Sequence, residues 1–365
     1  MKSNKVLMAM VAVVLMFICG SALVIAQEPE FVWRMQVIHS VGQSDFKQNQ
    51  QTAEEIYKAS NGRLKIEVHP TGTFASSLEA FQACSAGVFE MHSSWPAYIK
   101  GIEYAFLPLC TGNMTPDAHD IWVWLYEAGG WDLYQKAFDK VNLKMLAVEV
   151  WGTEVLMANR PFAGVFEMKG TKMRTSDPRL LARLGISGIA LPLEEVFTGL
   201  ATGSVDSAEF GHLAYNEGLG LTDITKYGIW PDFWNVHNTT TVVVNKDAWN
   251  KLPQDLQMIV ELAFKAREFQ HWSKSQYESA VLMKKLRDSG KMEFLRLDSA
   301  DFAKMRQAMY EIEQEDIKKY GGLTKEVYES KYRFMELWYP YKYMSRWWGW
   351  DVSPEEQLGY TPQGK

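Results

Sequence analysis

The chain has 365 residues, of which 22% are charged, and a net charge of −6. This mild acidity excludes nucleic acid and anionic lipid as preferred partners, because both require basic patches. It also means that local positive groups must attract any anionic ligand. A chain of this length exceeds what one simple core supports, so we expect two lobes.

The N-terminal segment has the three parts of a secretory signal peptide. Lys2 and Lys5 provide a positive start, residues 6–18 are apolar, and small residues lead to Ala26. A stop-transfer helix would need roughly 20 apolar residues and flanking charge. The pattern therefore predicts a signal peptide at 1–26, cleavage near Ala26 and a periplasmic mature chain.

The three cysteines bear on two questions, lipid modification and disulfide formation. Cys19 follows Met16-Phe17-Ile18, which lacks the small residues that precede a lipid-modified cysteine. Cleavage leaves Cys84 and Cys110. In an oxidising compartment they could form a disulfide, and two buried free thiols fit the sequence equally well.

The first part of the mature chain alternates strand and helix patterns. Residues 32–39 and 64–69 alternate apolar and polar positions, and Asn61-Gly62 between them is a typical helix stop. The expected order is a strand at 32–39, a helix at 45–60, a strand at 64–69, and a helix at 77–86 leading into 88–91. Such an order predicts an α/β fold with a parallel sheet.

A second unit begins after a near-continuous apolar strand at 144–151. The β-branched run at 239–245 predicts a further buried strand. The other expected elements are strands at 154–159 and 172–175 and helices at 178–184, 255–286 and 300–319. The tail from 338 to 350 is aromatic and basic, without a motif.

These elements, with the length of the chain, predict two α/β lobes and long C-terminal helices. Because no low-complexity linker separates the units, we expect several chain crossings. The expected division is residues 27–150 with about 236–280 for lobe 1, 151–235 with about 281–350 for lobe 2 and the C-terminal helices, and 351–365 as a tail.

Motifs of common enzyme classes are absent from the sequence. It contains no Gly-x-Ser-x-Gly, His-Glu-x-x-His, Cys-x-x-Cys, phosphate-loop or Gly-x-Gly-x-x-Gly pattern. Seven scattered histidines offer no nucleophile context. The sequence therefore favours a binding protein over an enzyme.

Several segments, taken in order, resemble the DctP-type solute receptors of tripartite ATP-independent periplasmic (TRAP) transporters. The resemblance covers about 30–290. The matching segments are His39-Ser40, NGRLKIEVHP at 61–70, AGVFEM at 86–91, NRP at 159–161, MKGTKMR at 168–174, LEEVFTGLATGSVDSAE at 193–209 and NKDAWNKLP at 245–253. The resemblance implies a two-lobed α/β periplasmic binding protein fold with a cleft between the lobes. It also implies that the lobes close on a ligand and that a membrane-embedded partner pair receives it.

Arg174 is the strongest candidate for ligand binding. It ends a short predicted strand, where a parallel sheet opens onto its crevice. A guanidinium offers two parallel donors to a carboxylate or sulfonate. The resemblance likewise implies that this arginine pairs with the ligand carboxylate; a solvated surface arginine is the alternative.

The resemblance also implies a metal site. In the branch that binds 2-oxo and 2-hydroxy monocarboxylates, a glutamate at the position of Glu209 and the carbonyl of the next residue, here Phe210, hold a metal ion. That branch has a glutamine where this chain has Glu154.

The presence of Glu154 in place of the branch's glutamine changes the net charge of the site. Glu154, Glu209 and a monoanionic ligand sum to −3, and Arg174 returns +1. A closed cleft does not hold the remaining −2 cheaply. Ca²⁺, a protonated glutamate or a positive group on the ligand would each compensate, whereas Na⁺ suffices for the branch's glutamine. Alternatively, Glu154 points into solvent.

Weaker candidates surround this centre. Six aromatic residues are candidate cleft walls, although most aromatics are core: Phe74, Trp95, Tyr98, Trp151, Phe210 and Trp234. Asn159 is a candidate hydrogen-bonding residue or a turn cap, and Asn235 is a candidate for the ligand or the metal. His39 is a candidate in the first loop, where a structural histidine is the alternative.

The sequence therefore predicts a TRAP receptor for a small 2-oxo or 2-hydroxy monocarboxylate with bound Ca²⁺ or Na⁺. A receptor for a small sulfonate such as isethionate, or for an aromatic or zwitterionic acid, is the alternative within this class. A ligand-sensing module for a membrane kinase is the alternative from another class. The C-terminal helices are a candidate homodimer contact.

Overall fold

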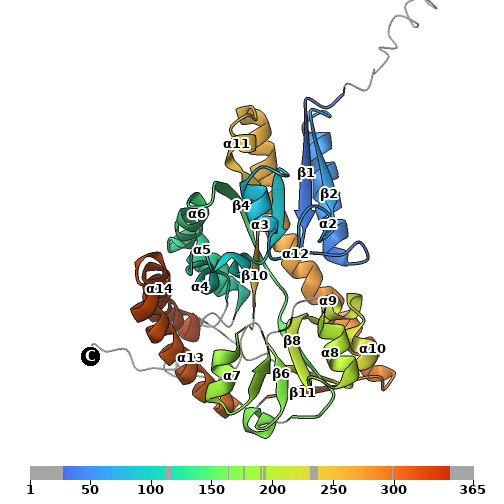
Figure 1. The fold of residues 1–365 in the computed structure, drawn as a ribbon, viewed down its shortest axis with the longest axis vertical. Coiled ribbons are helices and arrows are strands. Elements are labelled where there is room, and N and C mark those ends of the chain that lie inside the picture. Colours follow the sequence, from blue (N-terminus) through green and yellow to red (C-terminus); the bar gives the residue numbers. More distant parts are fainter. Residues whose placement is uncertain are drawn as a thin grey trace, which may run out of the picture.

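The computed structural model describes residues 28–345 except 112–116, 163, 176, 190, 192–194, 231–236 and 298. Two α/β lobes lie one above the other (Figure 1). The predicted signal peptide and the tail from 351 lie outside the described residues. Within the described part of the chain, no helix combines the length and apolar character needed to cross a membrane.

The first lobe is built on a five-stranded sheet in the order β2-β1-β3-β10-β4. Its strands are β1 (Phe31–Val37), β2 (Leu64–His69), β3 (Met91–Ser94), β4 (Leu143–Val150) and β10 (Thr239–Asn245). β1 runs parallel to β2 and β3, as predicted. β10 pairs antiparallel with β3 and β4, because this strand returns from the second lobe, so the sheet is mixed.

Helices cover both faces of this sheet. They are α2 (Ser44–Ala59), α3 (Ala80–Ser85), η1 (Pro96–Ile99), α4 (Phe106–Cys110), α5 (Ala118–Glu127), α6 (Gly130–Asp139) and α11 (Lys246–Trp249). Asn61 and Gly62, with φ of 52° and 81°, end α2 in the left-handed region and turn the chain into β2. All seven residues of β10 are buried, as expected for a β-branched strand covered on both faces.

The second lobe is built on a six-stranded sheet in the order β11-β9-β5-β8-β6-β7. Its strands are β5 (Glu154–Ala158), β6 (Lys172–Arg174), β7 (Ser187–Ile189), β8 (Ser207–His212), β9 (Tyr227–Trp230) and β11 (Glu293–Arg296). Its shorter helices are η2 (Val165–Met168), α7 (Pro178–Arg183), α8 (Val196–Thr202), α9 (Leu213–Gly218) and α10 (Leu221–Ile224). The two sheets and their helices confirm the predicted fold class.

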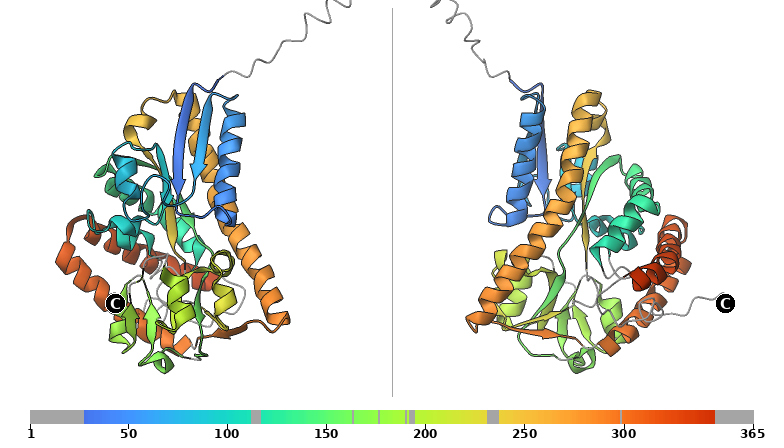
Figure 2. Two further views of the ribbon diagram at one scale, coloured as in Figure 1. Left: turned by 45° about the vertical axis from the view of Figure 1, so that its right-hand side comes forward. Right: turned by 180° about the vertical axis from the view of Figure 1, so that it is seen from behind.

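Helix α12 (Gln254–Asp288) spans both lobes. It packs on β4 and α2 of the first lobe and on α9, β8 and β11 of the second. Figure 2 shows this helix running along one side of the molecule past both sheets. Together with the β4–β5 and β9–β10 connections, it provides the chain crossings that the sequence predicted.

The two C-terminal helices divide between the lobes. α13 (Ser299–Tyr320) packs on α7 of the second lobe, whereas α14 (Gly322–Ser345) packs on α4 and α6 of the first. Leu323, Val327 and Met335 of α14 join the first lobe's core. The apolar face of α14 is therefore buried against first-lobe helices.

The cysteine question left open by the sequence has a structural answer. Cys84 and Cys110 are both buried and free, so they form no disulfide with each other. Burial raises the pKa of the Cys110 thiol to about 12. Both thiols pack inside the first lobe as small apolar side chains.

Candidate ligand-binding site

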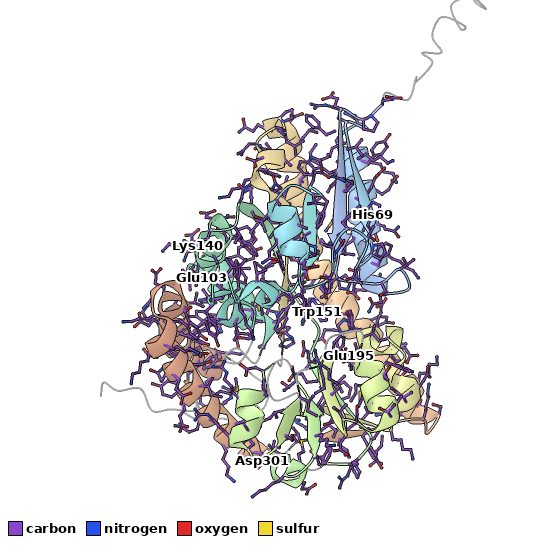
Figure 3. All side chains as sticks on the ribbon, in the orientation of Figure 1. His69, Glu103, Lys140, Trp151, Glu195 and Asp301 are labelled. Atoms are coloured by element: carbon purple, nitrogen blue, oxygen red, sulfur yellow. The ribbon has the colours of Figure 1, made fainter. Side chains whose placement is uncertain are left out.

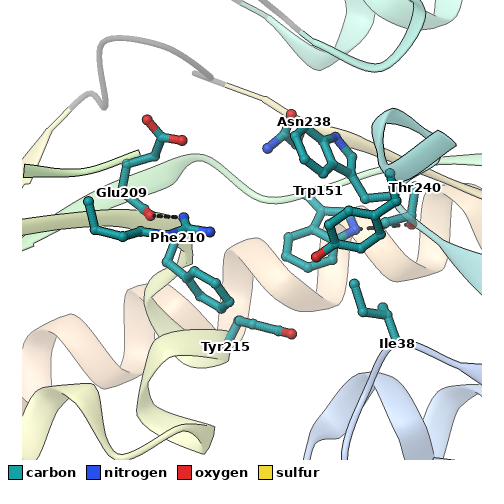
Figure 4. A pocket seen from close by; sticks show the side chains of 10 residues that line it. Ile38, Trp151, Glu209, Phe210, Tyr215, Asn238 and Thr240 are labelled. Carbon is teal, nitrogen blue, oxygen red and sulfur yellow. Dashed lines mark hydrogen bonds between the residues drawn. The ribbon is translucent and has the colours of Figure 1, made fainter. Parts of the chain in front are cut away.

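A cavity of about 50 Å³ lies where the two lobes meet. Trp151, which lines it, sits at this junction in the whole molecule (Figure 3). Both lobes and the crossing strands contribute walls, as the close view shows (Figure 4). The lining residues are Ile38, Trp95, Tyr98, Trp151, Arg174, Glu209, Phe210, Tyr215, Asn238 and Thr240.

Arg174 is the last residue of β6 and is held in place by backbone carbonyls. Its Nη1 donates to the Glu209 carbonyl at 2.5 Å, and its Nε donates to the Leu191 carbonyl at 3.4 Å. The guanidinium carbon lies 4.9 Å from the centre of the Phe210 ring, a cation–π distance. Parallel pairing of β6 with β8 creates this arrangement, because it places Arg174 opposite Ala208, next to Glu209.

Glu209 lies on β8 and is 2% exposed. Its Oε2 accepts a hydrogen bond from Thr175 Oγ1 at 2.8 Å. The same residue thus orients Arg174 with its carbonyl and places a carboxylate at the cavity.

Glu154 begins β5 and is 1% exposed, so it does not point into solvent. Its Oε1 accepts from Asn238 Nδ2 at 2.7 Å. Asn238 lines the cavity, and its Oδ1 is buried and has no hydrogen-bond partner among the described residues. Glu154 therefore connects to the cavity through Asn238, and β5 pairs with the strand that carries Glu209.

Five of the ten described residues that line the cavity are aromatic. Trp151 packs against Tyr215 with ring centres 4.8 Å apart, and its Nε1 donates to Thr240 Oγ1 at 3.1 Å. Phe210 lies 5.7 Å from Tyr215, and Trp95 meets Tyr98 edge-on at 5.4 Å. A cation, a carboxylate and flat apolar walls are the features of a pocket for a small organic acid.

A family model described as DctP, bacterial extracellular solute-binding protein, family 7, matches residues 37–319. The chain belongs to the DctP family. As a member of this family of bacterial extracellular solute-binding proteins, it is a binding protein and not an enzyme, as the sequence predicted.

One curated relative is named a monocarboxylate 2-oxoacid-binding periplasmic protein, from Nostoc sp. (strain PCC 7120). It is 28% identical to this chain over 240 residues, which are 64% of this chain and 65% of the relative. The match thus spans just under two thirds of that relative's length.

Solved structures of TRAP solute-binding proteins share the fold. One from Colwellia psychrerythraea, with bound calcium and pyruvate, has a TM-score of 0.79 at 23% identity and covers 87% of this chain and 98% of its own. One from Bordetella bronchiseptica, a mixed-occupancy dimer with copurified calcium and picolinate, has a TM-score of 0.79 at 18% identity. It covers 87% of this chain and 95% of its own.

Some predicted site residues of this DctP-family chain lie away from the cavity wall. Asn159 donates to the Leu200 carbonyl at 3.1 Å, which links β5 to α8. Phe74 stacks on Phe89 at 5.3 Å inside the first lobe. Trp234 and Asn235 lie outside the described residues.

His39 lies behind the wall rather than in it. It is fully buried, and its ring centre lies 5.9 Å from those of Trp151 and Tyr215. Burial lowers the pKa of His39 to about 4. The ring is therefore neutral at neutral pH and adds no positive charge to the site.

Four lining residues were not predicted from the sequence: Ile38, Tyr215, Asn238 and Thr240. Thr240 and Asn238 belong to the β-branched strand and its approach, and strand ends facing a cleft are a usable signal. Ile38 and Tyr215 resemble ordinary core residues, because only tertiary packing brings them to the cavity.

The burial of His39 predicts a pH-dependent stability contribution. Its folded pKa lies below the unfolded value of about 6.5, so the unfolded chain binds the extra proton between pH 4 and 6.5. This contribution to the free energy of unfolding is present above pH 6.5 and is lost as pH falls towards 4. The stability difference between wild type and His39→Gln should therefore shrink by about 1–2 kcal/mol from pH 7 to pH 5 in urea titrations. Equal differences at both pH values would contradict the assignment.

Proposed function

We propose that this receptor binds a small 2-oxo or 2-hydroxy monocarboxylate together with Ca²⁺ and delivers it to the membrane subunits of a TRAP transporter. The observation that carries this proposal is Arg174, whose guanidinium lines an interlobe cavity beside Glu209 and Phe210. Backbone carbonyls accept from Nε and Nη1 of the guanidinium, and the Phe210 ring lies at cation–π distance. This arrangement orients the group and leaves N–H donors for a ligand carboxylate.

The dimensions of the cavity favour a ligand with few heavy atoms. A volume of about 50 Å³ corresponds to room for about four water molecules at roughly 10–15 Å³ each. Most of the wall is apolar, and among the described residues Arg174 is the one cationic residue that lines it. The cavity therefore suits a ligand with a single negative group. A compact monoanion fits this combination better than a sugar acid or a long dicarboxylate.

The donor set near the cavity suits a hard cation. The carboxylates of Glu154 and Glu209, the carbonyl of Phe210 and the Oδ1 of Asn238 are all oxygen ligands, which Ca²⁺ prefers. Among the described residues, Asn238 Oδ1 has no hydrogen-bond partner. With a monoanionic ligand and Arg174, the two buried glutamates leave a net charge of −2, and a divalent ion cancels it. Held by these residues, Ca²⁺ would supply positive charge to the oxygens of the ligand.

A sequence relative and structural neighbours support this ligand class. The Nostoc relative is named for 2-oxoacids, and the Colwellia neighbour holds calcium with pyruvate. Flat aromatic acids are a second candidate, because five rings line the cavity and the Bordetella neighbour holds calcium with picolinate. A sulfonate such as isethionate would use the same guanidinium.

The remaining parts of the proposal concern location and assembly. We infer that residues 1–26 direct export and are cleaved near Ala26, which puts the receptor in the periplasm with its ligand. A homodimer through the C-terminal helices stays a proposal, which the dimeric Bordetella neighbour supports by analogy.

Ligand screening with and without metal tests the proposal. Native mass spectrometry of gently purified protein should show a bound small acid and calcium. Pyruvate or lactate with Ca²⁺ should raise the melting temperature, and EDTA should reverse the shift. Stabilisation by picolinate alone would favour an aromatic acid as the ligand. Stabilisation by isethionate alone would favour a sulfonate. No stabilisation by any of these acids would contradict the proposal.

Glu154→Gln should change the metal preference. The substitution removes one buried negative charge from the residues that would hold the metal ion. Ca²⁺ affinity rises with the number of charged residues that coordinate the ion, so it should fall here. We expect Ca²⁺ to bind about 10–100-fold more weakly, with Na⁺ now sufficient for ligand binding, measured by calorimetry in each salt. Glu67→Gln on the outer surface of β2 is the matched control and should leave both unchanged. Unaltered Ca²⁺ affinity in Glu154→Gln would remove this residue from the metal site.

A further inference from the structure

A charged cluster joins the two lobes beside the ligand cavity but outside its wall. Tyr104 belongs to the first lobe, between η1 and α4, whereas Arg179 lies on α7 and Asp316 on α13. Arg179 Nη2 donates to the Tyr104 hydroxyl at 2.9 Å, and that hydroxyl donates to Asp316 Oδ2 at 3.0 Å. Arg179 Nη1 also donates to Asp316 Oδ1 at 2.6 Å. One tyrosine hydroxyl thus bonds directly to two elements of the opposite lobe.

The cluster continues towards the cavity through Asp177. The Asp177 carboxylate accepts from Arg179 Nε at 2.9 and 3.0 Å, and it caps the N-terminus of α7 by accepting from Arg179 N at 3.0 Å. Pro178 at the first helical position reinforces this start. Arg179 and Asp177 are therefore fixed to each other and to the end of β6.

Thr175 links this helix start to the site. Asp177 N donates to Thr175 Oγ1 at 3.3 Å, and Thr175 Oγ1 donates to Glu209 Oε2 at 2.8 Å. A continuous series of hydrogen bonds thus leads from the first-lobe hydroxyl of Tyr104 to the carboxylate of Glu209.

Burial and charge make these bonds strong. Asp177 and Asp316 are 4% and 2% exposed, so the carboxylate ends of their bonds to Arg179 are shielded from water, whereas the Arg179 side chain is 35% exposed. Burial raises the pKa of the Tyr104 hydroxyl, which keeps it protonated and able to donate at neutral pH. The Tyr104 ring stacks on Tyr320 of α13 with centres 3.6 Å apart, which orients the hydroxyl.

We propose that Tyr104 is a positioning residue that latches the two lobes together through Arg179 and Asp316 and, through Asp177 and Thr175, sets the orientation of the Glu209 carboxylate. Its effect on affinity rests on the ligand-binding function proposed above, whereas its effect on the distance between the lobes does not. The contact between the lobes has two states, made and broken. The Tyr104 hydroxyl bonds to the second-lobe groups only in the lobe arrangement of this structure.

Two single-hydroxyl variants test the latch. Tyr104→Phe removes the bonding hydroxyl and keeps the stacked ring, whereas Tyr320→Phe removes the hydroxyl of the other ring in the stack, which takes part in none of the cluster's bonds above. Spin labels on exposed positions Gln51 of α2 and Ala201 of α8 report the distance between the lobes in ligand-free protein. We expect a broader or shifted distance distribution for Tyr104→Phe and the wild-type distribution for Tyr320→Phe. Identical distributions for wild type and Tyr104→Phe would overturn the latch.

Affinity measurements test the connection to Glu209. With Ca²⁺ and pyruvate, or whichever screened acid wild type binds, Tyr104→Phe should bind about tenfold more weakly, the effect typical of groups that orient metal ligands. Thr175→Val should also weaken binding, and Thr175→Ser, which keeps the hydroxyl, should restore it. Combining Tyr104→Phe with Thr175→Val should cost less than the two separate losses multiplied, because both interrupt one series of bonds. Multiplicative losses would show that Tyr104 does not act through Thr175.

The two readouts separate the two hypotheses. If wild type binds none of the screened acids, the proposed function fails, and the distance distribution still decides the latch. If wild type binds and Tyr104→Phe binds equally well with an unchanged distribution, the latch fails and the proposed function stands.

Discussion

Arg174→Ala should reduce affinity for the carboxylate ligand by about 10–150-fold. Charge-assisted hydrogen bonds of this type contribute about 1.5–3 kcal/mol, and 1.4 kcal/mol corresponds to a tenfold change. The loss should lie towards the upper end, because the ligand carboxylate would then face the buried Glu209 without a compensating guanidinium. Isothermal titration calorimetry with the best ligand from the thermal-shift screen measures this effect.

Two further variants separate the role of geometry from that of charge. Arg174→Lys keeps the positive charge but loses the planar pair of donors, so it should recover only part of the affinity. Arg160→Ala removes an exposed arginine of the same lobe and should bind like wild type. Affinity within tenfold of wild type in Arg174→Ala would show that the ligand anchor is another residue.

Arg267→Met should lower the free energy of unfolding by about 3–5 kcal/mol, because it leaves a buried carboxylate uncompensated. Arg267 and Glu149 form an ion pair at 3.0 Å, and their side chains are 2% and 0% exposed. Arg267 Nη1 also donates to Asn49 Oδ1 at 2.6 Å. The pair thus ties α12, the helix that spans both lobes, to β4 and α2. Urea titration monitored by circular dichroism gives the value.

The double variant Arg267→Met with Glu149→Leu should be more stable than Arg267→Met, because an apolar pair replaces the isolated charge. Lys65→Met, which breaks an exposed ion pair with Glu67, is the control and should change stability little. An Arg267→Met variant as stable as wild type would show that water or another cation compensates Glu149.

Much of the ligand centre could be predicted because Arg174 has a local signal and the resemblance to the DctP-type receptors points to Glu154, Glu209 and Phe210. Arg174 ends a short strand, and Glu209 with Phe210 follows on the neighbouring strand, so sheet pairing alone places them together. Glu154 and the aromatic residues Trp95, Tyr98 and Trp151 were also identified as candidates, and the structure places all of them at or next to the cavity. Their roles in binding stay predictions until the variants above are measured.

Other features depended on contacts between distant parts of the chain. The hydroxyl of Tyr104 meets Arg179 and Asp316 across 75 and 212 positions of sequence, respectively. Neither residue type nor local spacing distinguishes Tyr104 from an ordinary core tyrosine. Asn159 shows the converse, since its amide satisfies a backbone carbonyl of α8 rather than lining the cavity.

The sequence by itself determined the alternation of strands and helices, the α/β class and the arginine at a strand end, because these follow from local periodicity and side-chain chemistry. The tertiary structure alone decided that β10 inserts antiparallel, that α14 covers the first lobe and that Ile38 and Tyr215 reach the cavity. These outcomes depend on which apolar faces bury each other when the whole chain packs, and local patterns do not specify that choice.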